Sequence, residues 1–383
     1  MLRGIRRKQQ IPRRSWNRLA EARRRAKPSP VSTCSTGGLM NNGLDRAEDI
    51  YIGAPAGPPP STLEELLQDS WWHDVLFVLS ETSFATHDFF RRMDAVAGLF
   101  PITTQTISSP MGAGSDSLPV KAAIQGAEIY LPDSLQFVLE LGCRVSGKPC
   151  YYLMPSFRGE QADQRHLCEF FHAEVEVFGG LQDVMGVAEN FVLHLTQVLL
   201  QRCGDVIARH AGTTRHAEAM VLRGPRFPQI RFAEACMLLA EAPGAIHDLP
   251  SGVTITPAGE RELLKAFGDF VWLTHMPWSS VPFYQKRETD TRFALNADLL
   301  AGYGEILGSG ERAADGGEVL GNLAMQGVAT DAYGWYVDMK TRHHMQTAGF
   351  GLGIERYLMW LLACPDIRRL AMLRRQWGER FVP

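Results

Sequence analysis

The sequence predicts an α+β fold in which a mainly antiparallel sheet is flanked by helices. Two observations predict this class. From Val96 to about residue 180, short alternating stretches of apolar residues are broken by Gly and Pro, as in antiparallel strands. Strand-like and helical segments then intermingle without the regular βαβ rhythm of a parallel sheet. The 383-residue chain is long enough to bury a substantial core.

The first predicted helix begins at Ser61, which forms a capping box with Glu64. Residues 28–60 are rich in Pro, Ser and Gly, so we expect residues 1–60 to be a basic arm with a flexible linker and residues 61–383 to be one folded domain. The further elements predicted, in chain order, are helices over His87–Val96 and Leu181–Arg209, a strand and helix within Phe227–Ala242, strands within Gly268–Pro277 and Thr291–Leu300, and a helix over Gly353–Cys364.

Composition narrows the class of protein. No apolar run approaches the roughly 18–20 residues that cross a bilayer, so we expect no membrane span. The seven cysteines are scattered without a CxxC or Cys/His cluster, which indicates a reducing cytoplasm and argues against a zinc site. We therefore expect a cytoplasmic protein.

The N-terminal arm is strongly basic. Residues 1–27 hold eleven Lys or Arg and a single acid, Glu21. Because the whole chain carries −3, the remaining residues carry −13, a poor match for the phosphates of nucleic acid. The arm could bind RNA. It could equally be a disordered solubility tail, an organellar targeting peptide, or sequence upstream of a true start at Met40.

The first candidate site is a polar loop followed by an alternating strand, within Ser156–Phe178. Along the strand, Phe170 shares a face with an imidazole and carboxylates, while the other face is apolar. Guanidinium groups suit phosphate and a free aromatic face suits a base, so this segment could bind a nucleotide; it could also be a solvated hairpin with incidental salt bridges. The charged loop residues are Arg158, Glu160, Arg165 and His166.

Two acids flank a predicted chain reversal. Gly302 and Gly304 on either side of Tyr303 favour a turn, which would bring Asp298 and Glu305 near one another. Two oxygen ligands without a nearby Cys or His suit Mg²⁺ held between carboxylates and substrate phosphates. Two surface acids in a turn are the plainer interpretation.

Three alternate glycines stand in the segment Thr347–Trp360 and lead into Glu355 and Arg356. A dinucleotide fingerprint needs a βαβ unit and a different spacing, and only about 30 residues follow Gly353, so that interpretation fails. The pattern instead indicates a strand with bare alternate positions, against which something flat could lie.

Together and in this order, the three segments resemble the motifs of class II aminoacyl-tRNA synthetases. Phe157–Glu160, Arg165–Phe170 and Glu174–Glu176 match the second motif, and Gly349–Arg356 matches the third. The segment Thr274–Arg287 resembles the aspartate/asparagine branch. The match covers roughly residues 85 to 380 and implies a synthetase-like catalytic domain over 61–383, built on an antiparallel sheet.

The resemblance implies roles for the residues above. Arg158 and Arg356 would be catalytic groups that grip the α- and γ-phosphates of ATP. Phe170 would stack under adenine, and Asp298 and Glu305 would hold Mg²⁺. The remaining implied ATP-binding residues are Glu160, Arg165, His166, Glu169, Glu305, Gly351 and Gly353.

The segment Pro132–Gly142 resembles the amino-acid-binding helix of the same branch, with Ser134 and Gln136 in place. Aspartate-activating members carry a Lys where Leu139 stands; here Glu140 follows, as in asparagine-type enzymes. A carboxylate at this position prefers an amide and repels aspartate. Arg312 would receive the side-chain carbonyl, so the resemblance implies an asparagine-like or aspartate-like substrate.

Three departures from the branch pattern affect this assignment. Thr347 stands where a His is usual, and Met111 where a Glu contacts the α-ammonium group. We also expect no anticodon-binding barrel, since residues 1–60 could not supply one. In that respect the chain also resembles the archaeal-type AMP-forming asparagine synthetase.

These features predict an ATP-dependent, AMP-forming ligase that makes an aminoacyl-AMP and passes it to ammonia or a small amine, with tRNA a doubtful partner. The alternative is an asparaginyl-tRNA ligase, and a less favoured one is an inactive, synthetase-like regulatory protein. The family resemblance also implies a homodimer whose interface includes the segment near Pro101.

Overall fold

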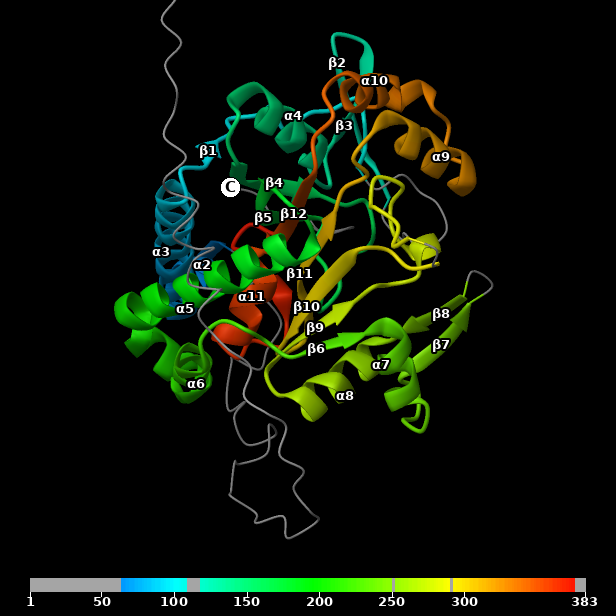
Figure 1. Ribbon diagram of the computed structural model, residues 1–383. Helices are drawn as coiled ribbons and strands as arrows, with labels where there is room; N and C mark the ends of the chain where they lie inside the picture. The colour runs from blue at the N-terminus through cyan, green and yellow to red at the C-terminus, as the bar shows by residue number, and fades with distance from the viewer. Residues whose placement is uncertain (1–62, 109–117, 250–251, 290–291, 376–383) are drawn as a thin grey trace, which may run out of the picture. The chain divides into compact units, whose positions relative to one another are not determined.

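The computed structural model describes residues 63–108, 118–249, 252–289 and 292–375 (Figure 1). They all belong to one compact unit, Asp45–Pro383. The basic arm, the Ser61 capping box and the predicted boundary at residue 60 lie outside the described residues.

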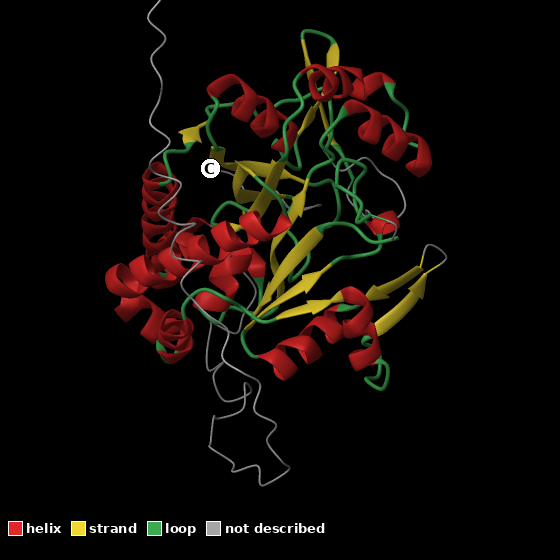
Figure 2. Cartoon of the chain, viewed as in Figure 1, coloured by secondary structure: helices red, strands yellow, loops and turns green. Residues whose placement is uncertain are grey.

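A single large sheet organises this unit. Its eight strands run in the order β1-β4-β5-β12-β11-β10-β9-β6. The six inner strands are all antiparallel, and only the edge strands β1 and β6 pair in parallel, which confirms the predicted fold class (Figure 2). The strands are β1 (Val96–Ala97), β4 (Cys150–Phe157), β5 (Glu169–Phe178), β6 (Gln229–Arg231), β9 (Phe270–Thr274), β10 (Asn296–Ala301), β11 (Gly304–Glu311) and β12 (Thr347–Gly353).

The remaining elements surround this sheet. Two small hairpins are β2 (Val120–Ile124) with β3 (Ala127–Leu131), and β7 (Ile246–Leu249) with β8 (Gly252–Ile255). The helices are α2 (Leu63–Gln68), α3 (Ser70–Arg92), α4 (Gln136–Ser146), α5 (Leu181–Ala211), α6 (Arg215–Arg223), α7 (Phe232–Leu239), α8 (Pro257–Phe267), α9 (Gly316–Gln326), α10 (Gly334–Arg342) and α11 (Ile354–Leu361). None of these described helices is long and apolar enough to cross a membrane.

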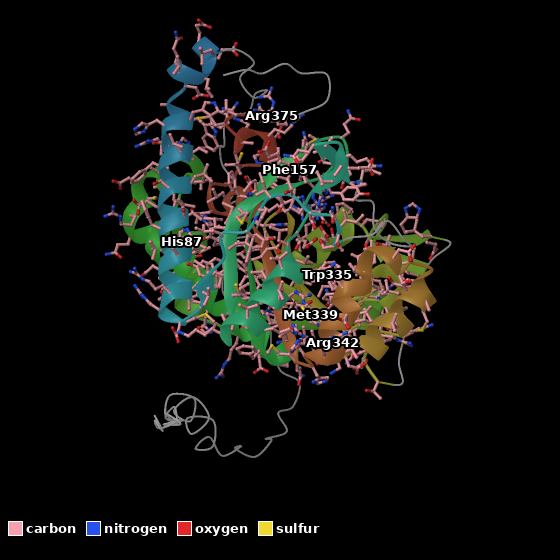
Figure 3. All side chains as sticks on the ribbon, turned by 90° about the horizontal axis from the view of Figure 1, so that it is seen from above. His87, Phe157, Trp335, Met339, Arg342 and Arg375 are labelled. Carbon is pink, nitrogen blue, oxygen red and sulfur yellow. The ribbon has the colours of Figure 1, made fainter. Side chains whose placement is uncertain are left out.

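One face of the sheet carries the main hydrophobic core. Ala173, Val175 and Val177 of β5 are buried against α5 and α11, as the alternation of the sequence predicts. Fully burying such a side chain stabilises the fold by about 1.5–3 kcal/mol. The opposite face of β5 is polar and forms the floor of the candidate site. Seen from above, α3 with His87 and α10 with Trp335 and Met339 lie on different sides of the sheet (Figure 3).

The prediction of a helix over His87–Val96 is wrong at both ends. α3 begins at Ser70, where the Asp69 side chain accepts a hydrogen bond from the Trp71 amide, and it ends at Arg92. Asp94 then adopts a positive φ of 58°, which interrupts the helix, and Val96 enters strand β1. The spacing of apolar residues did not predict α4, because this helix lies between strands in a segment where apolar and polar residues alternate. Only the resemblance of Pro132–Gly142 to a family helix indicated it.

The later predictions agree with the structure within a few residues. The long helix over Leu181–Arg209 is α5, and the helix over Gly353–Cys364 is α11. The chain reversal at Gly302 and Gly304 is the tight turn between β10 and β11, where both glycines have positive φ.

Candidate functional site

Strand β12 lies between β5 and β11, and its glycines allow side chains from the neighbouring strands to cross it. Gly349 pairs with Glu176, and Gly351 pairs with Glu174. A Cβ added at Gly351 would lie 3.2 Å from Glu174 Oε1, and one at Gly349 would overlap the Glu176 carboxylate. The bare strand therefore accommodates the carboxylates of β5 at one end.

At the other end of β12 a cleft opens over the sheet. Eight of the ten residues predicted to bind ATP line it; Glu160 and Glu169 do not. His172, which the alternation of the strand placed on the same face as Phe170, also lines the cleft, as does Glu355; neither was among the residues predicted to bind ATP. The eight residues are Arg158, Arg165, His166, Phe170, Glu305, Gly351, Gly353 and Arg356.

The cleft combines an aromatic ring with cationic groups. The Arg158 guanidinium carbon lies 5.7 Å from the centroid of the Phe170 ring. The buried Nε of Arg158 has no hydrogen-bond partner among the described residues. Burial lowers the pKa of Arg356, and burial together with Arg356 lowers the pKa of His166. These are the properties of a site that accepts a base and its phosphates.

The predicted acidic pair meets beside the β10–β11 turn. A Cβ added at Gly308 would lie 3.2 Å from Glu305 Oε1 and 3.6 Å from Asp298 Oδ1, so both carboxylates reach the same point. Burial raises the pKa of the Asp298 carboxyl well above its ordinary value, and the negative charge of the nearby Glu305 adds to this effect. Arg356 Nη1 donates to the Glu305 backbone oxygen (3.0 Å), which places the cation next to the acids.

This donor set fits Mg²⁺. It consists of carboxylate oxygens beside a cleft with cationic walls, where the ion could share substrate phosphates. No group of three or more His, Cys, Asp or Glu in the described parts of the chain is arranged to hold a metal unaided. A divalent ion would therefore depend on the nucleotide for its remaining ligands.

Glu260 of α8 is a site residue that the sequence analysis missed. Its Oε2 accepts a hydrogen bond of 2.6 Å from Arg165 Nη2. Burial raises the pKa of Glu260, and Arg165 partly offsets that rise. The pair packs over Gly304, where a Cβ would overlap the Arg165 guanidinium. No motif marks Glu260, because it approaches Arg165 from a separate helix.

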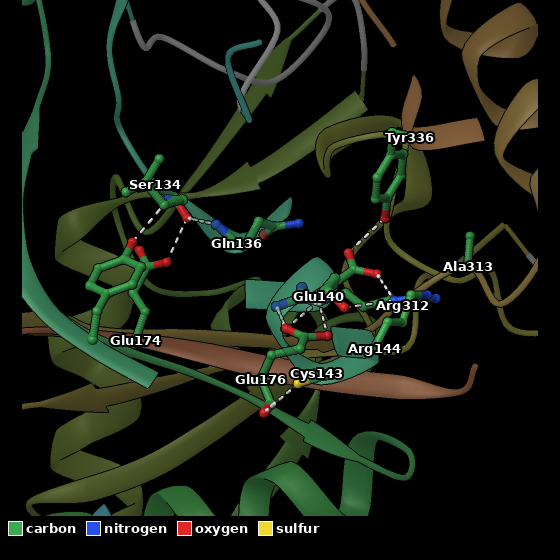
Figure 4. A network of polar contacts seen from close by, with 12 residues as sticks. Ser134, Gln136, Glu140, Cys143, Arg144, Glu174, Glu176, Arg312, Ala313 and Tyr336 are labelled. Atoms are coloured by element: carbon green, nitrogen blue, oxygen red, sulfur yellow. Dashed lines mark hydrogen bonds and ion pairs between the residues drawn. The ribbon is translucent and has the colours of Figure 1, made fainter. Parts of the chain in front are cut away.

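The predicted amino-acid site lies at the Gly349 end of β12, around α4 (Figure 4). Ser134 Oγ donates to Glu174 Oε2 (2.6 Å) and accepts from the Gln136 amide (3.2 Å). The buried Nε2 of Gln136 has no hydrogen-bond partner within the described structure. An unpaired buried donor costs free energy, so this amide is available to a ligand.

Arg312 is held in a buried ion pair. Its Nε and Nη2 contact the Glu176 carboxylate at 3.1–3.2 Å, and its guanidinium carbon lies 5.6 Å from the Tyr284 ring centroid. Burial lowers the pKa of Arg312, but Glu176 more than offsets this, so the pKa is raised. Burial also raises the pKa of Glu176, against the effect of Arg312.

Glu140 is completely buried, and its two closest side-chain partners come from a part of the chain about 200 residues away. Tyr336 donates to Glu140 Oε1 (2.6 Å), and Lys340 forms an ion pair with Oε2. Both partners lie on α10. The sequence analysis missed them, because the sequence gives no signal that α4 and α10 meet.

The two substituted positions differ in what the structure describes. Thr347 is buried at the start of β12, beside Glu176, and its carbonyl accepts a hydrogen bond from the Arg312 amide (2.9 Å). Met111 lies outside the described residues.

Comparison with known proteins agrees with this architecture. Residues 73–376 match the sequence profile of the family described as tRNA synthetases class II (D, K and N). The asparagine–tRNA ligase of Sorangium cellulosum is 31% identical over 310 residues, covering 77% of this chain and 68% of the relative. The asparagine–tRNA ligase of Roseiflexus sp. is 30% identical over 310 residues, covering 79% and 69%.

A solved structure shows the same likeness. The asparaginyl-tRNA synthetase of Pyrococcus horikoshii complexed with asparaginyl-adenylate superposes with a TM-score of 0.76 at 25% identity, covering 85% of this chain and 76% of that chain. A structure described as a putative aspartyl-tRNA synthetase, from Leishmania major, has a TM-score of 0.68 at 20% identity and shares the fold.

Proposed function

The chain belongs to the class II tRNA synthetases (D, K and N), a family of AMP-forming ligases, and on this premise we propose that it activates asparagine with ATP and transfers it to tRNA. The sequence alone favoured ammonia or a small amine as the acceptor. The relatives support tRNA instead. This chain covers 68% and 69% of the length of two relatives, and both are named asparagine–tRNA ligases. Binding of tRNA, doubted from the sequence, is therefore part of the proposal.

The observation that carries the proposal is the single cleft that gathers eight predicted nucleotide residues beside the acidic pair. Adenine would stack on Phe170, with the phosphates between Arg158 and Arg356. The substrate carboxylate then attacks the α-phosphorus, the bond to the bridging oxygen breaks, and pyrophosphate leaves. The arginines stabilise the developing charge. Asp298 and Glu305 would hold Mg²⁺, which neutralises phosphate charge when bound.

The choice of asparagine rests on Glu140 and Arg312. Glu140 offers an acceptor to the amide NH₂, and Arg312 offers a donor to the amide oxygen. Ser134 and Gln136 would contact the rest of the amino acid. An aspartate-activating member would instead carry a Lys where Leu139 stands, next to Glu140.

We also propose that the protein is a homodimer. On α3, Leu76, Phe77 and Phe84 are 55%, 38% and 67% exposed, and Leu99, just after the edge strand β1, is 99% exposed. Large apolar side chains exposed along one helix and the strand that follows it favour a protein interface. Leu99 lies in the segment near Pro101 that the family resemblance implies is part of the dimer interface.

Pyrophosphate exchange against asparagine, aspartate and non-proteinogenic analogues tests the first half of the reaction. We expect asparagine to support exchange best, and Arg158→Ala and Arg356→Ala to abolish it. AMP release is then measured with tRNA, with ammonia, and with neither. Formation of asparaginyl-tRNA supports the proposal; amide formation with ammonia and no charging of tRNA would show that the acceptor is wrong.

A further inference from the structure

Lys340 is the most deeply buried cation near the proposed amino-acid site. It projects from α10 and is 0% exposed. Its Nζ forms an ion pair with Glu140, donates to the Ala313 carbonyl (2.8 Å) and lies 5.1 Å from the centroid of the Tyr336 ring. A buried ammonium group is stable only when it is paired in this way.

The same lysine connects the two residues proposed to recognise the amide. Glu140 belongs to α4, whereas Ala313 directly follows Arg312 at the end of β11. Lys340 therefore holds both the Glu140 carboxylate and the backbone carbonyl of Ala313, the residue that follows Arg312. Figure 4 shows Glu140, Arg312 and Ala313 gathered in one network.

Two further cations lie near the Glu140 carboxylate. Arg144 Nη1 is 3.7 Å from Glu140 Oε2, beyond hydrogen-bonding distance, and Arg312 interacts with Glu140 electrostatically. Tyr336 contributes a neutral hydrogen bond. Removing Lys340 would thus leave a fully buried carboxylate without its closest counter-charge and without the contact that fixes its position.

We propose that Lys340 determines the selectivity for an amide over a carboxylate side chain, by holding the Glu140 carboxylate in place opposite the substrate. This inference rests on the proposed function. A correctly placed Glu140 carboxylate accepts a hydrogen bond from the asparagine amide and repels aspartate. A displaced carboxylate would lose both effects, and the preference for asparagine would shrink.

The test compares kcat/KM in pyrophosphate exchange for asparagine and aspartate. We expect Lys340→Met to lower the asparagine-to-aspartate ratio by at least roughly tenfold, mainly through a higher KM for asparagine. Lys340→Arg retains the charge, and its ratio should stay within about threefold of the wild-type value. Circular dichroism confirms that each variant is folded.

A double-mutant cycle separates selectivity from packing. Glu140→Gln removes the carboxylate and should lower the ratio as Lys340→Met does, while the double variant should lose little more. The double variant removes both members of the Lys340–Glu140 ion pair, and Arg144 keeps its hydrogen bonds to the backbone oxygens of residue 140 and His343, so this variant provides the test even if Lys340→Met does not fold.

Three results have distinct meanings. A wild-type enzyme without preference for asparagine contradicts the proposed function. A wild-type preference that persists in the folded Lys340→Met variant, or in the double variant, overturns the inference about Lys340 alone. Equal losses for both amino acids in these variants would overturn it as well, because they indicate a purely structural role.

Discussion

The carboxyl group of Glu355 makes the stability of the fold depend on pH. Both of its oxygens accept hydrogen bonds of 3.1 Å from the Phe171 amide, which joins α11 to β5. Burial raises the pKa of Glu355 from 4.5 to about 7, although these backbone hydrogen bonds act in the opposite direction. Between these two pH values the folded chain binds a proton that the unfolded chain releases. The free energy of unfolding therefore falls as the pH rises through this window.

The size of the effect follows from the shift. Each pKa unit corresponds to about 1.4 kcal/mol, so raising the pH from 5 to 8 should cost roughly 2–3 kcal/mol through this group. Glu355→Gln removes the titration and keeps an oxygen acceptor for the Phe171 amide. Relative to wild type, the variant should become more stable by that amount between pH 5 and pH 8.

Urea unfolding, followed by circular dichroism at constant ionic strength, measures the free energies of unfolding of the variant and of wild type at each pH. The two are comparable when both proteins have the same m-value. Glu241→Gln is the matched control, because Glu241 is exposed and its removal should leave the pH profile unchanged. If the profiles of Glu355→Gln and wild type run parallel, the buried carboxyl does not titrate as argued.

Three further predictions concern the site and the proposed interface. Asp298→Asn should lower pyrophosphate exchange roughly 100-fold and raise the Mg²⁺ concentration needed for half-maximal rate, as a magnesium titration would reveal; an unchanged titration contradicts the metal assignment. Glu260→Gln should raise the KM for ATP roughly three- to tenfold with the KM for asparagine unchanged, because it weakens the contact that holds Arg165. Phe84→Asp should yield monomers in light scattering, whereas Leu222→Asp, on the exposed surface of α6, should leave a dimer; a wild-type monomer would refute the interface.

The sequence predicted the elements whose signals are local. The apolar period of α5, the alternation of β5 and the glycines of the β10–β11 turn each depend on neighbours within a few residues. The start of α3 was missed because an Asp69 cap immediately follows the short helix α2, so that two helices adjoin. Helix ends are decided by single capping contacts, which periodicity does not show.

Site residues with remote partners were beyond sequence reasoning. Glu260 meets Arg165 across 95 positions and Tyr336 meets Glu140 across 196. Each contact is set by how a helix from a distant part of the chain packs in the folded unit. Nothing within a few residues of Tyr336 indicates that its hydroxyl faces a buried carboxylate.

The two halves of the candidate site differ in how their charges are balanced, and this difference bears on what each half can bind. Arg158 has no ion-pair partner among the described residues, and its buried Nε is unpaired, so the nucleotide cleft has cationic capacity for a polyanion. In the proposed amino-acid half, the three carboxylates of Glu140, Glu174 and Glu176 are already matched in number by the cations Lys340, Arg312 and Arg144. Adding a net charge there would disturb a balanced buried network, which is costly at low dielectric. A neutral amide adds none, so the charge balance favours asparagine over aspartate independently of the individual hydrogen bonds.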